Sequence, residues 1–77
     1  MLLNRMNVWV SEVKDADGNI QPKVLHWHDG REWLVERVLH ICRSPDREFD
    51  GTRYAVLIAG VEKYLYRDGE QWYVDAA

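Results

Sequence analysis

The sequence predicts an all-β fold: a single small antiparallel meander or partly closed barrel of about six strands. The first observation behind this prediction is an internal echo. Residues 64–75 repeat the pattern of residues 25–36, with an apolar and aromatic run, an Asp-Gly pair, and a Trp-x-Val run closed by an acid. That pattern is typical of a β-hairpin. The second observation is that four Asp-Gly pairs divide the chain into short segments, and each pair indicates a chain reversal because glycine accepts positive φ and aspartate hydrogen-bonds its own backbone in turns.

The first two expected strands cover residues 6–14 and 20–28, with Asp17-Gly18 as the turn between them. In the first of them the residues from Val8 to Val10 are consecutively apolar, which indicates burial on both faces. Residues 1–5 precede this strand and are expected to be disordered, as chain termini often are.

The segment 31–43 allows two interpretations. As a strand it continues the first echoed hairpin, and it then needs a bulge near Arg37-Val38 to place its apolar residues usefully. As a helix it has an apolar arc opposite a charged arc, Asp29 with Glu32 resembles a capping box, and Pro45 stands where a helix would stop. We prefer the strand because the second copy of the echo is clearly strand-like. The alternative, with a helix at 31–43, would make the fold α+β.

The two echoed hairpins should share one register. We expect a three-residue loop in each, ending with glycine in the left-handed conformation. Leu25 then lies opposite Trp33, and Tyr64 lies opposite Trp72. An exposed loop is expected from Ser44 to Gly51, where proline and charged residues gather. The remaining expected strands cover residues 52–59, 61–67 and 70–75.

The composition fits one small domain covering residues 1–77, since 47% of the residues are hydrophobic and 12% aromatic, too apolar for a disordered chain. Ten basic residues stand against thirteen acidic ones with the signs interspersed, which disfavours nucleic acid as a partner. No apolar run approaches the ~20 residues of a membrane helix, so no membrane association is expected. The single cysteine, Cys42, excludes an internal disulfide, and we expect a cytoplasmic protein.

Two histidine-containing pairs raise the question of a metal site. His26-x-His28 and His40-x-Cys42 each place two ligands on one side of a strand, as a zinc site could use them. His40 lies about 26 Å along the strand from the position opposite His26, at ~3.3 Å per residue, so we predict no metal and no cofactor. Cys42 beside His40 lacks the third group that orients a catalytic base, and its apolar surroundings indicate an inert core thiol. No catalytic residue is therefore predicted.

The expected role is that of a non-catalytic accessory or protein-interaction domain, a monomer or weak homodimer with an unknown protein partner. Its candidate contact surface lies around the Asp29-Gly30 turn and consists of Trp27, Arg31 and Trp33, because aromatic residues beside arginine are favoured at interface hot spots. The alternative function is a single-stranded nucleic-acid-binding module, in which exposed aromatic side chains would stack on bases.

The stretch from Pro22 to Leu39 resembles a family of short uncharacterised bacterial proteins that is frequent in actinobacteria. The family pattern is Pro, apolar, Trp, Gly-Arg, aromatic, x-Val and Val-Leu, and here His28-Asp29 adds one residue before Gly30. A weaker likeness continues through residues 53–57 and 71–74. The resemblance implies a compact β-rich domain. It points to no particular activity, because the family has no known function, and it makes an enzyme less expected. The matching residues are Pro22, Leu25, Trp27, Gly30, Arg31, Trp33, Val35, Val38 and Leu39.

Overall fold

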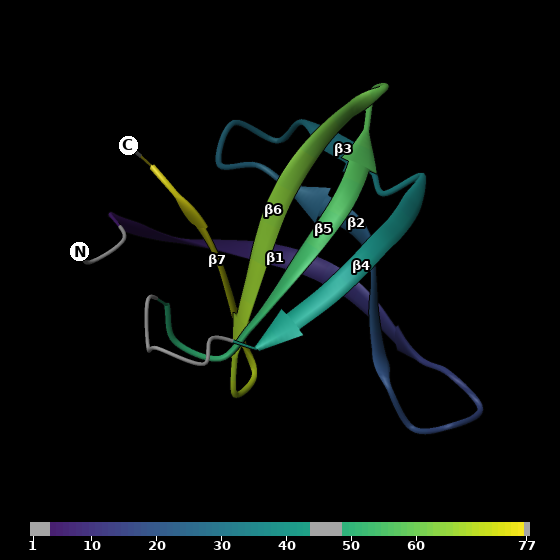
Figure 1. Cartoon of the computed structure of the whole chain (residues 1–77). Helices are drawn as coiled ribbons and strands as arrows, with labels where there is room; N and C mark the ends of the chain where they lie inside the picture. The colour runs from purple at the N-terminus through teal and green to yellow at the C-terminus, as the bar shows by residue number, and fades with distance from the viewer. Residues whose placement is uncertain (1–3, 44–48, 77) are drawn as a thin grey trace.

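The computed structural model is one antiparallel sheet of seven strands that curls into a half-barrel (Figure 1). It describes residues 4–43 and 49–76. None of these residues is helical, so the all-β prediction is confirmed, the alternative helix at 31–43 is wrong, and the described ranges contain no helix that could cross a membrane. The strands are β1 (Arg5–Lys14), β2 (Ile20–His26), β3 (Glu32–Leu34), β4 (Arg37–Arg43), β5 (Thr52–Ile58), β6 (Val61–Asp68) and β7 (Gln71–Asp75).

The strand order in the curled sheet is β3-β2-β1-β7-β6-β5-β4. Consecutive strands pair with each other except for β3 and β4, which form the two edges, and β7 returns to pair with β1. The chain joins the two edges through Val35 and Glu36. The Val35 N–H donates to the Lys23 carbonyl at 2.9 Å, and the Glu36 N–H donates to the Leu57 carbonyl at 2.8 Å. This corner therefore hydrogen-bonds to both sides, and the predicted partly closed barrel is confirmed.

The single strand expected over 31–43 is broken at this corner. The bulge lies between Val38 and His40, close to the expected position. Val35 is buried in the core, whereas Leu34 is 65% exposed. The helical pattern in this stretch misleads because hydrogen bonds to β2 and β5 outweigh local periodicity; tertiary context often overrides propensity in this way.

The second echoed hairpin differs from the predicted register. Trp72 lies opposite Arg67, and the expected pairing of Tyr64 with Trp72 is wrong. The cause is the turn: two residues, beginning with Gly69 at φ 62°, connect β6 to β7 where a three-residue loop was expected. Because side chains alternate between faces, this difference turns Trp72 to the face of Leu65 and away from that of Tyr64.

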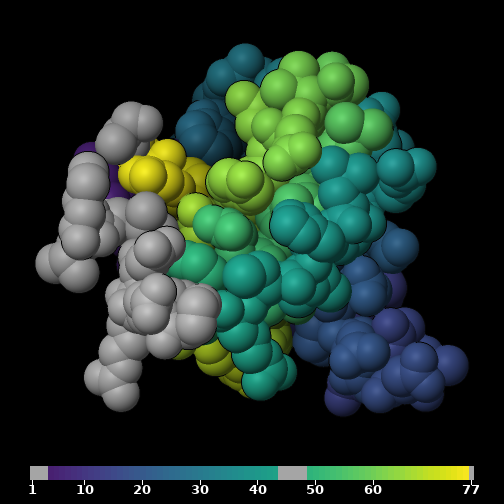
Figure 2. Space-filling view, in the orientation of Figure 1, coloured from purple at the N-terminus to yellow at the C-terminus, as the bar shows by residue number. Residues whose placement is uncertain are grey.

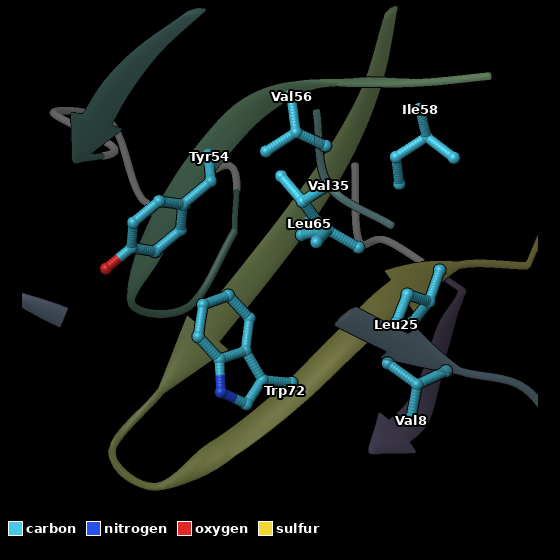
Figure 3. Close-up of a cluster of buried hydrophobic side chains, with 8 residues drawn as sticks. All are labelled: Val8, Leu25, Val35, Tyr54, Val56, Ile58, Leu65 and Trp72. Atoms are coloured by element: carbon cyan, nitrogen blue, oxygen red, sulfur yellow. The ribbon is translucent and has the colours of Figure 1, made fainter. Parts of the chain in front are cut away.

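The main core fills the inner face of the curled sheet. Buried side chains from five strands, β1, β2, β5, β6 and β7, and from the Val35 corner converge there (Figure 3). The rings of Tyr54 and Trp72 lie 5.1 Å apart, and Val56 and Leu65 are almost completely buried. In a domain this small the aromatic side chains supply much of the buried area. The buried members are Val8, Leu25, Val35, Tyr54, Val56, Ile58, Leu65 and Trp72.

A second apolar cluster lies on the opposite face of β6 and β7. Tyr66 stacks on Tyr73 with ring centroids 4.9 Å apart, and Phe49 meets Tyr66 edge-on at 5.2 Å. The Tyr73 hydroxyl donates to the Asp50 carbonyl at 2.7 Å. Most of the loop expected to be exposed, residues 44–48, lies outside the described residues. Its described end contradicts that expectation at Phe49, which is buried.

The beginning of the described chain is held in the sheet. Arg5 belongs to β1 and pairs with Asp75 of β7. Its guanidinium lies 4.2 Å from the centroid of the Tyr73 ring and forms a 3.1 Å ion pair with Asp68. The expected disorder of residues 1–5 is therefore wrong for Arg5, and residues 1–3 lie outside the described ranges.

One end of the barrel is closed by a polar contact across three strands. The Glu12 carboxylate of β1 accepts hydrogen bonds from the Trp72 indole at 2.7 Å and from Arg67 Nε at 3.2 Å. Beside them the Tyr54 hydroxyl donates to the Ile20 carbonyl at 3.1 Å, and burial raises the pKa of this phenol. These contacts lie toward the β6–β7 turn. The opposite end of the barrel lies at the β2–β3 and β5–β6 turns and is open, because residues of both turns line a groove there.

Candidate functional site at the open end of the barrel

The β2–β3 turn brings the predicted contact residues to the open end. The Trp27 N–H donates to the Arg31 carbonyl at 2.8 Å, and the Gly30 N–H donates to the Trp27 carbonyl at 3.0 Å. Gly30 has φ 91°, as the last residue of a three-residue loop requires. The predicted register of this hairpin is confirmed, with Leu25 opposite Trp33.

Arg31 is fixed on this turn by its neighbour Asp29. The Asp29 carboxylate accepts the Arg31 backbone N–H at 3.0 Å and the Arg31 Nε at 2.6 Å. The first of these bonds is the main reason that the pKa of Asp29 lies below its ordinary value. The Arg31 guanidinium also lies 5.7 Å from the centroid of the Trp33 ring. Its charge is therefore partly compensated within the turn.

The turn forms one wall of a groove of about 620 Å³. Trp27 and Trp33 are half-buried: they pack against the core cluster and also line the groove. The volume lies in the range of ~300–1,000 Å³ that small-ligand sites usually occupy. In Figure 2 the segments that border the groove, the β2–β3 turn, β6 and the end of β7, meet at the upper left. The lining consists of Leu25, Trp27, Arg31, Trp33, Ile58, Ala59, Val61, Lys63, Tyr64, Leu65, Tyr66, Val74 and Asp75.

The opposite wall of the groove comes from β6, which the sequence reasoning did not include in the site. β6 pairs with β5 from Val61 to Arg67, but with β7 only from Tyr66 to Asp68. The two strands therefore separate toward the open end, and the groove lies along this split. A signal for this wall was present in the sequence, since Val61 and Leu65 flank Lys63 at the spacing of one strand face.

The groove is mainly apolar and contains three charged side chains, Arg31, Lys63 and Asp75. Arg31 is bound to Asp29 at 2.6 Å. Asp75 accepts the Asn4 backbone N–H at 3.3 Å. Lys63 forms no ion pair with any described residue. It is the one lysine or arginine of the groove wall whose charge is left to solvent or to a ligand.

The histidines of the sequence lie outside this groove. The His26 Nε2 is 2.6 Å from the Ser11 hydroxyl, and its Nδ1 is 3.0 Å from a Glu32 carboxylate oxygen. Serine hydrolases use this order of hydrogen bonds. Ser11, His26 and Glu32 line neither of the two grooves described, and their contacts form a polar ladder across β1, β2 and β3. Within residues 4–43 and 49–76, no three His, Cys, Asp or Glu side chains are placed to hold a metal ion.

The outer face of β1 exposes one aromatic side chain that the predicted contact surface omits. Trp9 is 81% exposed and borders a second, smaller groove of about 300 Å³ that His28 and Trp72 also line. Cys42 is half-buried against the cluster of Phe49, as expected of a small core thiol.

The fold and the groove together define a small half-barrel domain with one closed and one open end. Comparison of the chain with protein-family models, with curated proteins and with solved structures finds no match. The resemblance to the family of short bacterial proteins therefore stays a prediction.

Proposed function

We propose that this protein is a non-catalytic protein-interaction domain whose contact surface is the groove at the open end of the barrel. The observation that carries the proposal is the position of Trp27, Arg31 and Trp33. These residues were selected from the sequence for their chemistry alone, and all three line the 620 Å³ groove. The half-buried tryptophans offer large apolar faces on a rigid hairpin, a combination that favours them as binding anchors. We place the protein in the cytoplasm, in agreement with its single free cysteine.

The test uses peptides selected from a random library displayed on phage against the whole protein. Trp33→Thr removes an anchor, and Leu34→Thr is the matched control because Leu34 is the next residue of β3, 65% exposed and outside the groove. We expect Trp33→Thr to weaken selected peptides by about thirtyfold, the equivalent of ~2 kcal/mol for a hot-spot tryptophan. Leu34→Thr should leave their affinity unchanged.

Nuclear magnetic resonance locates the contact independently of affinity. Bound peptides should shift the indole N–H resonances of Trp27 and Trp33 and leave that of Trp72 in place, because the Trp72 indole is bonded to Glu12 at the closed end. Thermal melts of both variants check that Trp33→Thr is still folded. Equal affinity for the Trp33→Thr protein, or unmoved Trp27 and Trp33 resonances, would contradict the proposal.

Single-stranded nucleic-acid binding is a second candidate, and the exposure of Trp9 is the observation that favours it. Within the described residues, the exposed large aromatic side chains are Trp9 and, at 44%, Tyr64, and β7 lies between their strands. A stacking function predicts that oligonucleotides quench tryptophan fluorescence at low salt and that Trp9→Ala abolishes the quenching. Unchanged fluorescence would remove this candidate.

A further inference from the structure

The wall of the groove formed by β6 is an open strand edge. Toward β7, the pairing of β6 ends at Tyr66, and from Val61 to Leu65 no described strand lies against that edge. This segment is about 17 Å long at ~3.4 Å per residue. An unpaired row of backbone N–H and C=O groups is a template for a further strand.

The register shows which backbone groups point to the open side. Ile58 and Val61 flank the two-residue turn between β5 and β6 and so form a hydrogen-bonded pair. In an antiparallel pair every second residue forms backbone hydrogen bonds to its partner strand, so in β6 the residues bonded to β5 are Val61, Lys63 and Leu65. The backbone N–H and C=O of the residues between them, Glu62 and Tyr64, consequently point into the split between β6 and β7.

The other two sheet edges are less suited to accept a strand. β3 covers only Glu32–Leu34. β4 has a bulge between Val38 and His40 and charged residues at both of its ends, Arg37 and Arg43. Short length, bulges and charges are the usual means by which proteins protect edges from pairing. The open segment of β6, Val61–Leu65, is longer than β3 and its pairing with β5 has no bulge. Its charged residues are Glu62, which does not line the groove, and Lys63, which does.

We propose that the groove binds an extended acidic peptide segment of a partner protein, which adds to the sheet as a strand against β6. This proposal rests on the proposed function and specifies its binding mode. Side chains of an added strand alternate between faces, so every second one would enter the groove between the Val61, Lys63 and Leu65 row and the indoles of Trp27 and Trp33. Peptide residues opposite Val61 and Leu65 should be apolar. The peptide residue opposite Lys63 should be acidic, because Lys63 has no ion-pair partner among the described residues.

The open edge is tested first on the free protein by amide hydrogen exchange. The N–H groups of Glu62 and Tyr64 should exchange rapidly, whereas those of Lys63 and Leu65 are bonded to β5 and should exchange at least tenfold more slowly. Equal protection along Val61–Leu65 would overturn the proposal, because it would mean that the edge is already paired.

The binding probe is a blocked peptide, Thr-Val-Thr-Asp-Thr-Val-Thr, whose Val, Asp and Val side chains match Val61, Lys63 and Leu65. A second peptide has lysine in place of the aspartate. Wild-type protein should prefer the aspartate peptide about fivefold, in line with the energy of a cross-strand charge pair, and Lys63→Glu should reverse the preference. Absence of saturable binding at millimolar peptide, or a preference that Lys63→Glu leaves unchanged, would overturn the proposal.

Backbone methylation separates strand addition from simple binding of side chains. N-methylation of the two threonines beside the aspartate removes the donors that face β6, and should weaken binding at least tenfold. N-methylation of the aspartate and one valine removes as many donors on the opposite side, and should weaken binding much less. If phage-selected peptides bind through Trp33 but tolerate both methylation patterns, the groove remains the contact surface and strand addition is overturned.

Two variants at one position repeat the test on the protein. Glu62→Pro removes an N–H that points to the open side, where an edge strand tolerates proline, and Glu62→Thr retains it. Only the proline variant should lose the peptide, with both variants folded by thermal melting. A dimer formed through β6, detected by sedimentation and abolished by Glu62→Pro, would overturn the proposal in favour of a second copy of this chain as the occupant.

Discussion

The substitution Gly51→Ala should destabilise the protein more than any other glycine-to-alanine change within residues 4–43 and 49–76. Gly51 has φ 83°, and a Cβ placed on it would overlap the backbone oxygen of Arg67 and lie 2.9 Å from the Asp68 Cα. Arg67 cannot easily move away, because it is paired with Thr52 in the β5–β6 ladder. A side chain at position 51 is therefore disfavoured twice, by the positive φ and by the overlap of its Cβ with the backbone of Arg67 and Asp68.

Gly18→Ala is the matched control, since Gly18 has φ 85° and nothing within 4 Å of the added Cβ. Its cost is the left-handed conformation alone, about 1–2 kcal/mol. Gly51→Ala adds the backbone overlap, and overpacking typically costs about 1–3 kcal/mol more. The expected losses are therefore about 1–2 kcal/mol for Gly18→Ala and about 2–5 kcal/mol for Gly51→Ala. The larger loss is comparable to the whole stability of a small domain, ~5 kcal/mol.

Urea unfolding followed by tryptophan fluorescence measures both losses in the same assay. We expect Gly18→Ala to lower the urea midpoint and, in a thermal scan, to lower the melting temperature by about 5–15 °C. Gly51→Ala should lower both by clearly more, or leave the protein unfolded at room temperature. Equal losses for the two variants would refute the reasoning. That result would show that the chain entering β5 can shift away from Arg67 at no cost.

Three further changes have defined outcomes. Ala59→Asn should raise the urea midpoint by the equivalent of about 0.5–1 kcal/mol, because Ala59 has φ 51° in a two-residue turn where asparagine is tolerated better. Glu12→Gln should lower stability by about 1 kcal/mol and shift the Trp72 indole N–H resonance, since it replaces the charged acceptor of that 2.7 Å hydrogen bond. Stability should fall as pH rises above 10.0, the ordinary pKa of tyrosine, because burial raises the pKa of Tyr54 and Tyr73 in the folded state while the unfolded chain ionises first. Urea midpoints measured across that range, with tyrosinate absorbance as the probe of ionisation, check the last outcome, and a flat profile would contradict it.

The features that could be predicted from sequence are those decided by a few adjacent residues. The Asp29-Gly30 turn is an example: the chain reversal and the left-handed glycine follow from local turn chemistry, and the expected three-residue loop gives the observed pairing of Leu25 with Trp33. Over most of the chain the all-β class follows from the closely spaced reversals. At 31–43, where a helix would also fit, it follows from the strand-like second copy of the echo. Strand order at the β1–β7 junction does not follow, since it joins residues from opposite ends of the chain.

The Asp68-Gly69 pair shows why the second hairpin could not be predicted. Asp29 and Gly30 both lie in a three-residue loop, whereas Asp68 ends β6 and Gly69 begins a two-residue turn. In the second case the register places Trp72 on the inner face, where its ring meets Tyr54 and its indole N–H meets Glu12. Those partners are far away in sequence, so packing energy selects a turn that local chemistry leaves undecided.

One wall of the candidate site could be predicted from the sequence and the other could not, for a related reason. Trp27, Arg31 and Trp33 are recognisable from residue type beside a turn, but the opposite wall depends on where β7 leaves β6. The point at which β7 separates from β6 depends on the pairing of β1, β6 and β7 together, which no short stretch of sequence determines. The contact between Ser11 and His26 could not be predicted from the sequence either. It depends on the register of β1 against β2, in which Ser11 lies two residues along the strand from Trp9, the residue opposite His26.

The opening between β6 and β7 is set by the pairing of β7 with β1 and by side-chain contacts at the closed end of the barrel. β7 pairs with β1 from Trp72 to Asp75, and just beyond it the Ala76 N–H donates to the Asn4 carbonyl at 2.8 Å. At the other end Glu12 holds β6 and β7 together through Arg67 and Trp72. At the closed end of the barrel, β6 and β7 are therefore held together through Glu12. At the open end, β7 pairs with β1, and a ligand in the groove does not have to break that pairing. A groove held open in this way needs little rearrangement on binding, so less of the interaction energy is lost to ordering the protein.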